Sequence, residues 1–305
     1  MPEPTPEPRR PGRWRDLATL TKPGITALIV LVAVGGYFLA QPPSIEPLRL
    51  GILVATGAMA SAGSAMLNHY IDRDLDSRMR RTRSRPLPGA RIQSSGSVAI
   101  GGLLLLGIGI GLASWLLNPL AGFSILLGGL TYVVVYTIWL KRRSSWNIVL
   151  GGFAGSAPAL AGSAAAVGGW TPAVLLFALL VFLWTPPHFW SLALLLRTDY
   201  LEAGLPMLPR MDDPAYSGKV VVVSAALLLP PSAALAFTGA VAWPVAVVLA
   251  GLAGLFVAFT APLWSDPSRA AARRGFIYSG PYLLAVVVAL VANHWLVALG
   301  VLTGR

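Results

Sequence analysis

Long apolar segments alternate with short polar connections along most of the chain. Each segment is close to the ~20 residues that a helix needs to cross a hydrocarbon core of ~30 Å. Nine segments can be distinguished, with approximate extents 25–40, 50–70, 97–117, 120–140, 147–168, 172–195, 220–239, 243–263 and 279–301. A backbone in lipid must satisfy its own polar groups, so each segment is expected to be a helix. The pattern predicts an all-α integral membrane protein with nine transmembrane helices.

Composition supports this class and narrows the chemistry. The 305 residues are 55% hydrophobic and 11% charged, whereas about a quarter of the residues are charged in soluble domains. The chain has no cysteine, which excludes disulfides, thiolate chemistry and cysteine-ligated metals. Residues 1–16 are rich in proline and arginine and are expected to form a disordered cytoplasmic tail. Residues 17–305 are expected to form a single membrane domain.

The formal net charge of +11 is unevenly distributed. Lysine and arginine collect in the N-terminal tail and in every second connection, the others being short and nearly free of them apart from Arg49. By the positive-inside rule, the N-terminus is cytoplasmic and the C-terminus lies on the opposite side. The charge therefore reports orientation in a lipid bilayer, and we expect no nucleic-acid partner.

An acidic motif follows the second apolar segment. Asn68, Asp72 and Asp76 are spaced four residues apart, so on a helix they share one face, while Asp74 points elsewhere. Oxygen-bearing side chains on one stripe suit Mg²⁺, which keeps several waters and shares its shell with phosphate oxygens. The alternative is that these acids only pair with arginines close by in the sequence, such as Arg73.

Further basic residues lie near this motif on the cytoplasmic side. The segment 79–88 contains four arginines, and guanidinium groups pair phosphate bidentately. Lys141 and Arg142 follow Tyr136 at the end of the fourth segment, from which they could reach the same phosphates. Alternatively, these residues only anchor the chain at the membrane surface.

The sixth segment contains two consecutive prolines, Pro186 and Pro187, followed directly by His188. The prolines are expected to break the helix and open backbone groups toward a cavity. His188 could then ligate a haem iron or orient a porphyrin propionate, with His69 and His294 as weaker candidates. The alternative is a histidine that satisfies a neighbouring backbone group.

These motifs together resemble the UbiA superfamily of intramembrane prenyltransferases. The resemblance covers residues 17–301 and rests on 68–76 with 79–87, on Lys22-Pro23, on 136–142 and on 147–152. The strings 184–190 and 199–209 resemble the branch that farnesylates haem. The resemblance implies nine helices around a central cavity. It also implies Mg²⁺ bound by Asn68, Asp72 and Asp76.

The second Asp-x3-Asp motif found in many members of the superfamily is incomplete here, because Ala203 follows Asp199 at that spacing. Asp199, and Glu202 beside it, are the remaining candidates for a second metal.

The implied reaction transfers farnesyl from farnesyl diphosphate to the 2-vinyl group of haem B, with addition of water, to give haem O. We therefore expect a transferase of the cell (inner) membrane, and the sequence leaves open whether it works beside a haem A synthase. The expected catalytic residues are Asn68, Asp72, Asp76, Lys141 and Asp199, with Asn68, Asp72, Asp76 and Asp199 as the metal ligands. The expected substrate-binding residues are Arg81, Arg85, Tyr136, Arg142, Trp184, His188, Trp190 and Tyr200.

Three other functions are open to a chain of this kind. A prenyltransferase with an aromatic acceptor such as 4-hydroxybenzoate would share the acidic motif, but the strings at 184–190 and 199–209 argue against it. A transporter would use broken helices around a midplane site, yet neither inverted repeats nor intramembrane charges are evident. A structural assembly factor would show no dependence on Mg²⁺.

Overall fold

The computed structural model describes residues 13–204, 206 and 212–302, and in these residues the regular secondary structure is entirely helical. The elements are α1 (Arg13–Thr21), α2 (Pro23–Leu39), α3 (Pro47–Ile71), α4 (Arg73–Arg78), α5 (Ser95–Leu116), α6 (Pro119–Leu130), the π-helix η1 (Thr131–Leu140), α7 (Asn147–Gly151), α8 (Phe153–Val167), α9 (Pro172–Leu195), α10 (Arg197–Glu202), α11 (Pro214–Ala226), α12 (Leu229–Ala234), the 3₁₀ helix η2 (Leu235–Thr238), α13 (Trp243–Thr260), the 3₁₀ helix η3 (Ala261–Trp264) and α14 (Arg269–Ala298).

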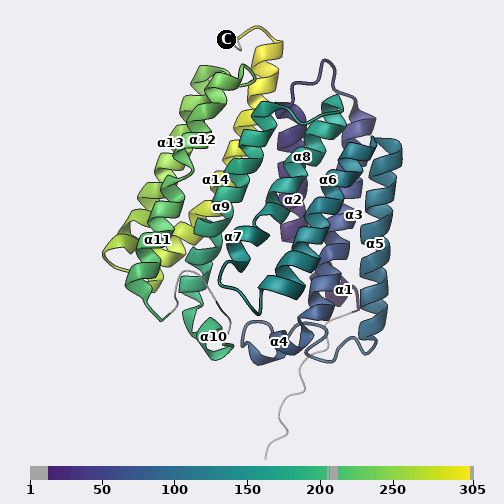
Figure 1. Cartoon of the computed structure of the whole chain (residues 1–305), viewed down its shortest axis with the longest axis vertical. Coiled ribbons are helices and arrows are strands. Elements are labelled where there is room, and N and C mark those ends of the chain that lie inside the picture. The colour runs from purple at the N-terminus through teal and green to yellow at the C-terminus, as the bar shows by residue number, and fades with distance from the viewer. Residues whose placement is uncertain (1–12, 205, 207–211, 303–305) are drawn as a thin grey trace, which may run out of the picture.

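The long helices run side by side as one bundle (Figure 1). Within the described residues, eight helical spans are long and apolar enough to cross a membrane, and the pair α1–α2, bent by 43°, supplies a ninth. The predicted nine-helix fold is therefore confirmed, and the chain is a multi-pass membrane protein. Helices α1, α4 and α10 lie at one end of the bundle, and α14 ends at the other (Figure 1).

Residues 13–16 differ from the prediction of a disordered tail. Helix α1 begins at Arg13, so residues 13–16, assigned to the tail, are helical. Asp16 ties this helix to the loop before α5, because it is buried and accepts a hydrogen bond of 2.9 Å from Arg91 Nε. The rest of the predicted tail, residues 1–12, lies outside the described residues.

Local sequence signals set several helix ends. Asn118 caps α6 by accepting from the Ala121 N–H at 2.8 Å, and Thr171 caps α9 by accepting from the Val174 N–H at 3.3 Å. A proline follows each of these caps at the first helical turn, where its fixed φ and missing N–H cost nothing. Gly168 ends α8 with a φ of 75°, a conformation that glycine adopts without steric penalty.

The predicted break at Pro186 and Pro187 is wrong, because α9 continues through both prolines from Pro172 to Leu195. Both prolines are buried, and α9 packs against α8, α11 and α14. Packing against neighbouring helices is what makes proline tolerable inside a membrane helix. The irregular helix lies elsewhere, in the π-helical turns of η1.

Glycines allow α2 and α8 to approach closely. A Cβ atom on Gly162 would overlap the carbonyl oxygen of Ala33, and one on Gly36 would overlap that of Ala159. The obstacle in each case is rigid backbone, so the helices would have to separate.

We expect Gly162→Ala to lower the free energy of unfolding by about 1–3 kcal/mol, because overpacking forces a backbone shift. Thermal unfolding in detergent is the measurement. The matched control is Gly111→Ala, since a Cβ there meets nothing within 4 Å. Equal melting temperatures for the two variants would contradict this view of the α2–α8 contact.

Candidate active site

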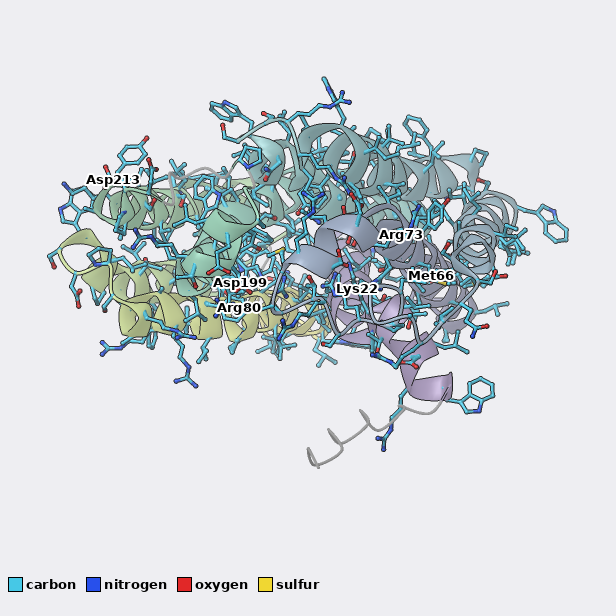
Figure 2. The ribbon with its side chains drawn as sticks, turned by 90° about the horizontal axis from the view of Figure 1, so that it is seen from below. Lys22, Met66, Arg73, Arg80, Asp199 and Asp213 are labelled. Carbon is cyan, nitrogen blue, oxygen red and sulfur yellow. The ribbon has the colours of Figure 1, made fainter. Side chains whose placement is uncertain are left out.

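A cavity of 610 Å³ lies inside the bundle, between α2, α3, α6–η1, α7–α8 and α9. Its walls are mostly apolar, and its polar residues come largely from the end where α3 meets α4. Figure 2 views the molecule from this end, with Lys22, Arg80 and Asp199 toward the middle and Asp213 near the edge. Ile25 lines the cavity and is about half exposed.

The acidic motif crosses the junction of α3 and α4. The Asp72 N–H donates to the Asn68 carbonyl at 2.9 Å, and the Asp76 N–H donates to the Asp72 carbonyl at 2.7 Å. These i, i+4 bonds keep the three side chains on one stripe. Asn68, Asp72 and Asp76 are all buried, and Asn68 Nδ2 donates to Asp72 Oδ2 at 2.7 Å.

Each residue of this stripe contacts a cation from another part of the chain. Lys22 Nζ donates to Asn68 Oδ1 at 2.6 Å, and Arg85 Nη1 donates to Asp76 Oδ2 at 2.7 Å. Lys141 Nζ pairs with Asp72 Oδ2. The acids therefore do not pair with Arg73, which donates to the Tyr70 carbonyl and stacks on the Tyr70 ring.

The stripe has the donors that Mg²⁺ uses. Asp72 Oδ1 is buried and makes no hydrogen bond, an orphaned acceptor that a bound cation would satisfy. Nowhere in the described ranges, this stripe included, do three histidine or acidic side chains converge to hold a metal by themselves. Two carboxylates and one amide oxygen suit an ion whose remaining ligands are waters and substrate phosphates.

Asp74 points away from this stripe. Arg142 donates to both of its carboxylate oxygens, at 2.8 and 2.7 Å. These hydrogen bonds lower the pKa of Asp74 to about 2, so it is ionised at neutral pH. Arg142 lies on the outer side of the motif, 3.8 Å from Asp72 Oδ1, and does not line the cavity.

The 199–202 segment contributes a tyrosine to the cavity. Tyr200 is buried and lines the wall, and burial raises the pKa of its hydroxyl. Asp199 instead accepts from the Arg81 N–H at 3.4 Å, and Glu202 pairs with Arg80 at 3.2 Å. Both acids therefore hold α10 against the loop that follows α4, and neither lines the cavity.

Most of the predicted site residues come together. Those that line the cavity are Asn68, Asp76, Arg81, Arg85, Tyr136, Lys141, Trp184, His188 and Tyr200, with Asp72 buried directly behind Asn68 and Lys141. The structure does not bring Arg142, Asp199 or Trp190 to the cavity.

The position of Trp190 follows from helix geometry. On α9, Thr185, His188, Phe189 and Leu192 line the cavity. At about 100° per residue, position 190 points away from their common direction. Trp190 instead packs in an apolar cluster with Ile148 and Val221.

Sequence reasoning missed Lys22 as a site residue, because its charge was assigned to topology. Lys22 adopts a left-handed backbone, with a φ of 47°, at the bend between α1 and α2. This bend lets its side chain reach Asn68 and the Tyr132 hydroxyl, at 3.0 Å from the latter. The sequence signal that could have identified Lys22 is the Lys22-Pro23 pair, one of the strings on which the family resemblance rests.

Fold and site together define an integral membrane enzyme with an apolar cavity and a cation-rich polar end, the class of the intramembrane prenyltransferases. The model of the UbiA prenyltransferase family matches residues 28–280, and the chain belongs to that family. It is therefore a transferase.

Relatives agree with this assignment, and solved structures share the fold. The chain is 41% identical to the protoheme IX farnesyltransferase of Metallosphaera sedula, over 91% of this chain and 95% of the relative. It is 36% identical to that of Hahella chejuensis, over 93% and 94%. The UbiA homolog from Archaeoglobus fulgidus, solved bound to GPP and Mg²⁺, superimposes with a TM-score of 0.67 at 16% identity, over 91% and 99% of the two chains. A digeranylgeranylglyceryl phosphate synthase superimposes with a TM-score of 0.75 at 16% identity, over 92% and 98%.

Proposed function

We propose that the chain transfers the farnesyl group of farnesyl diphosphate to the 2-vinyl group of haem B, with addition of water, giving haem O and diphosphate. The observation that carries this proposal is the cavity, an apolar chamber closed at one end by a cluster of buried acids and cations. The names of the relatives, protoheme IX farnesyltransferases, supply the acceptor.

The polar end suits the departure of diphosphate. Breaking the allylic C–O bond leaves both electrons on diphosphate and creates an allylic cation. Lys22, Lys141 and Arg85 surround the stripe, so fixed positive charge is present where negative charge develops. When bound by Asn68, Asp72 and Asp76, Mg²⁺ would neutralise diphosphate oxygens as a Lewis acid. Arg81 and Tyr200 line the same region and are proposed to contact the substrate.

The apolar part of the cavity suits the prenyl chain and the cation. It excludes water from the allylic cation until the acceptor has reacted. Tyr136 and Trp184 line the cavity, and their rings are assigned to stabilise this cation by cation–π attraction. The vinyl π electrons form the new C–C bond, and the resulting cation beside the porphyrin takes oxygen from water, which loses a proton.

Haem is a flat amphiphile that can approach sideways from lipid. We place the chain in the cell (inner) membrane, with α1, α4 and α10 on the cytoplasmic side, where prenyl diphosphates are made. A haem A synthase is the proposed consumer of the product.

The test is a choice of acceptor. Purified protein with farnesyl diphosphate and Mg²⁺ is given haem B in one reaction and 4-hydroxybenzoate in another, and products are separated by chromatography. We expect a prenylated product only with haem B. Prenylation of 4-hydroxybenzoate alone would overturn the proposed acceptor and leave the class of enzyme standing.

A further inference from the structure

Helix α9 presents a histidine whose ring is held from three sides. His188 lines the cavity. Its ring is stacked on Trp184, with centroids 4.5 Å apart and planes 16° apart, and it contacts Phe276 of α14 at 5.2 Å. Its Nδ1 lies 2.5 Å from Ser279 Oγ. The imidazole therefore cannot turn freely.

The hydrogen bonds of Ser279 decide which ring nitrogen carries the proton. Ser279 Oγ donates to the Phe276 carbonyl at 2.5 Å, and a carbonyl can only accept. A hydroxyl has a single proton, so toward His188 the Ser279 oxygen acts as the acceptor. His188 Nδ1 must then be the donor. In the neutral ring this leaves Nε2 unprotonated, with its lone pair available.

The lone pair on Nε2 has no partner among the described residues, since no hydrogen bond to it is found while the side chain lines the cavity. This is the arrangement of a metal-ligating histidine, in which one nitrogen binds the metal and the other donates to a fixed acceptor. Trp184 helps to fix the orientation of His188, because its indole N–H donates to the Ser279 carbonyl at 2.9 Å. Ser279 therefore fixes both the imidazole and the indole stacked on it.

We propose that His188 Nε2 is an axial ligand of the haem iron and that Ser279 is the residue that positions it. This inference rests on the proposed function, because it takes haem B as the acceptor. His188 lies seven residues before the end of α9 at Leu195, about 10 Å along the helix. Ligation by His188 would hold the porphyrin deeper in the bundle than the diphosphate.

His69 is the competing ligand. It lines the same cavity, is buried, and makes no hydrogen bond through either ring nitrogen. No aromatic stacking contact or side-chain hydrogen bond holds the His69 ring within the described residues, whereas His188 is held by Trp184 and Ser279. A comparison of the two histidines therefore decides the inference.

The experiment titrates ferric haem B into the purified full-length protein without prenyl diphosphate, and records the Soret band and the electron paramagnetic resonance spectrum. We expect a histidine-ligated spectrum in the wild type and in His69→Ala, and its loss in His188→Ala. Added imidazole should restore ligation in His188→Ala, because the cavity left by the side chain can hold it. Binding of farnesyl diphosphate, measured on each variant, shows that the fold is intact.

Ser279→Ala tests the positioning role. We expect haem affinity to fall by about 10–100-fold with an altered Soret band, the usual effect of removing the partner of a ligating histidine. The matched control is Ser224→Ala, a buried serine away from the cavity whose hydroxyl donates to carbonyls of its own helix.

An unchanged spectrum in His188→Ala, or loss of ligation in His69→Ala instead, would overturn the inference. The first result, obtained with a wild type that makes haem O, would leave the proposed function intact. A wild-type protein that binds no haem B at all would contradict both the inferred ligation and the proposed function.

Discussion

Replacing Asp76 by asparagine is expected to reduce haem O formation by at least about 10²–10³-fold, the range seen when one preorganised charge-stabilising group is removed. Asp76 is buried, lines the cavity and pairs with Arg85 at 2.7 Å. The substitution keeps the size of the side chain and removes the negative charge that attracts the metal ion and pairs with Arg85. Asp72→Asn should behave alike, because Asp72 is paired with Lys141 at the same end of the cavity.

The matched control for these variants is Asp74→Asn. It lies in the same segment, is exposed, and pairs with Arg142 away from the cavity. Initial rates are measured over a series of Mg²⁺ concentrations, with thermal unfolding as a check on folding. Full activity in Asp72→Asn or Asp76→Asn would remove the stripe as the metal site. Equal losses in all three variants would contradict the metal site. They would show that the total negative charge of the segment matters, and not whether a carboxylate belongs to the buried stripe.

Lys22→Met is expected to have the second largest effect, again about 10²–10³-fold on kcat/KM, because it removes a fixed positive charge from the diphosphate end. Lys22 reaches this end only because the chain bends between α1 and α2. The long apolar side chain of methionine keeps most of the packing, so the loss is electrostatic.

The control for Lys22→Met is Lys219→Met, since Lys219 lies on α11 over the Trp264 ring, away from the cavity. Steady-state kinetics with varied farnesyl diphosphate separate a rise in KM from a fall in kcat. A charge that acts mainly as the C–O bond breaks lowers kcat. Wild-type kinetics in Lys22→Met would show that its contact with Asn68 is only structural.

The sequence was sufficient to predict the membrane spans, because a span is recognised from the apolar length of one continuous segment. Apolar length predicts a span, and Asn118-Pro119 or Thr171-Pro172 mark where a helix starts. The bounds of α9, and of α6 taken together with η1, were therefore close to those predicted. The stripe of Asn68, Asp72 and Asp76 is local in the same way, since four-residue spacing alone places the side chains on one face.

The parts of the site that the sequence did not predict depend on contacts between distant segments of the chain. Lys141 meets Asp72 and Lys22 meets Asn68 across the bundle, and spacing along the chain carries no information on such pairs. The role of Ser279 was hidden for the same reason, because it lies on α14 while His188 lies on α9. Pro186 and Pro187 misled because a local helix-breaking tendency was outweighed by tertiary packing around α9.

The most direct test of the proposed reaction supplies the purified protein with haem B, farnesyl diphosphate and Mg²⁺ in water enriched in a heavy oxygen isotope, and analyses the porphyrin by mass spectrometry. We expect a product with the mass of haem B plus farnesyl and one hydroxyl, carrying the heavy oxygen, and no product when Mg²⁺ is chelated. Recovery of unmodified haem B from a folded protein that binds farnesyl diphosphate would contradict it.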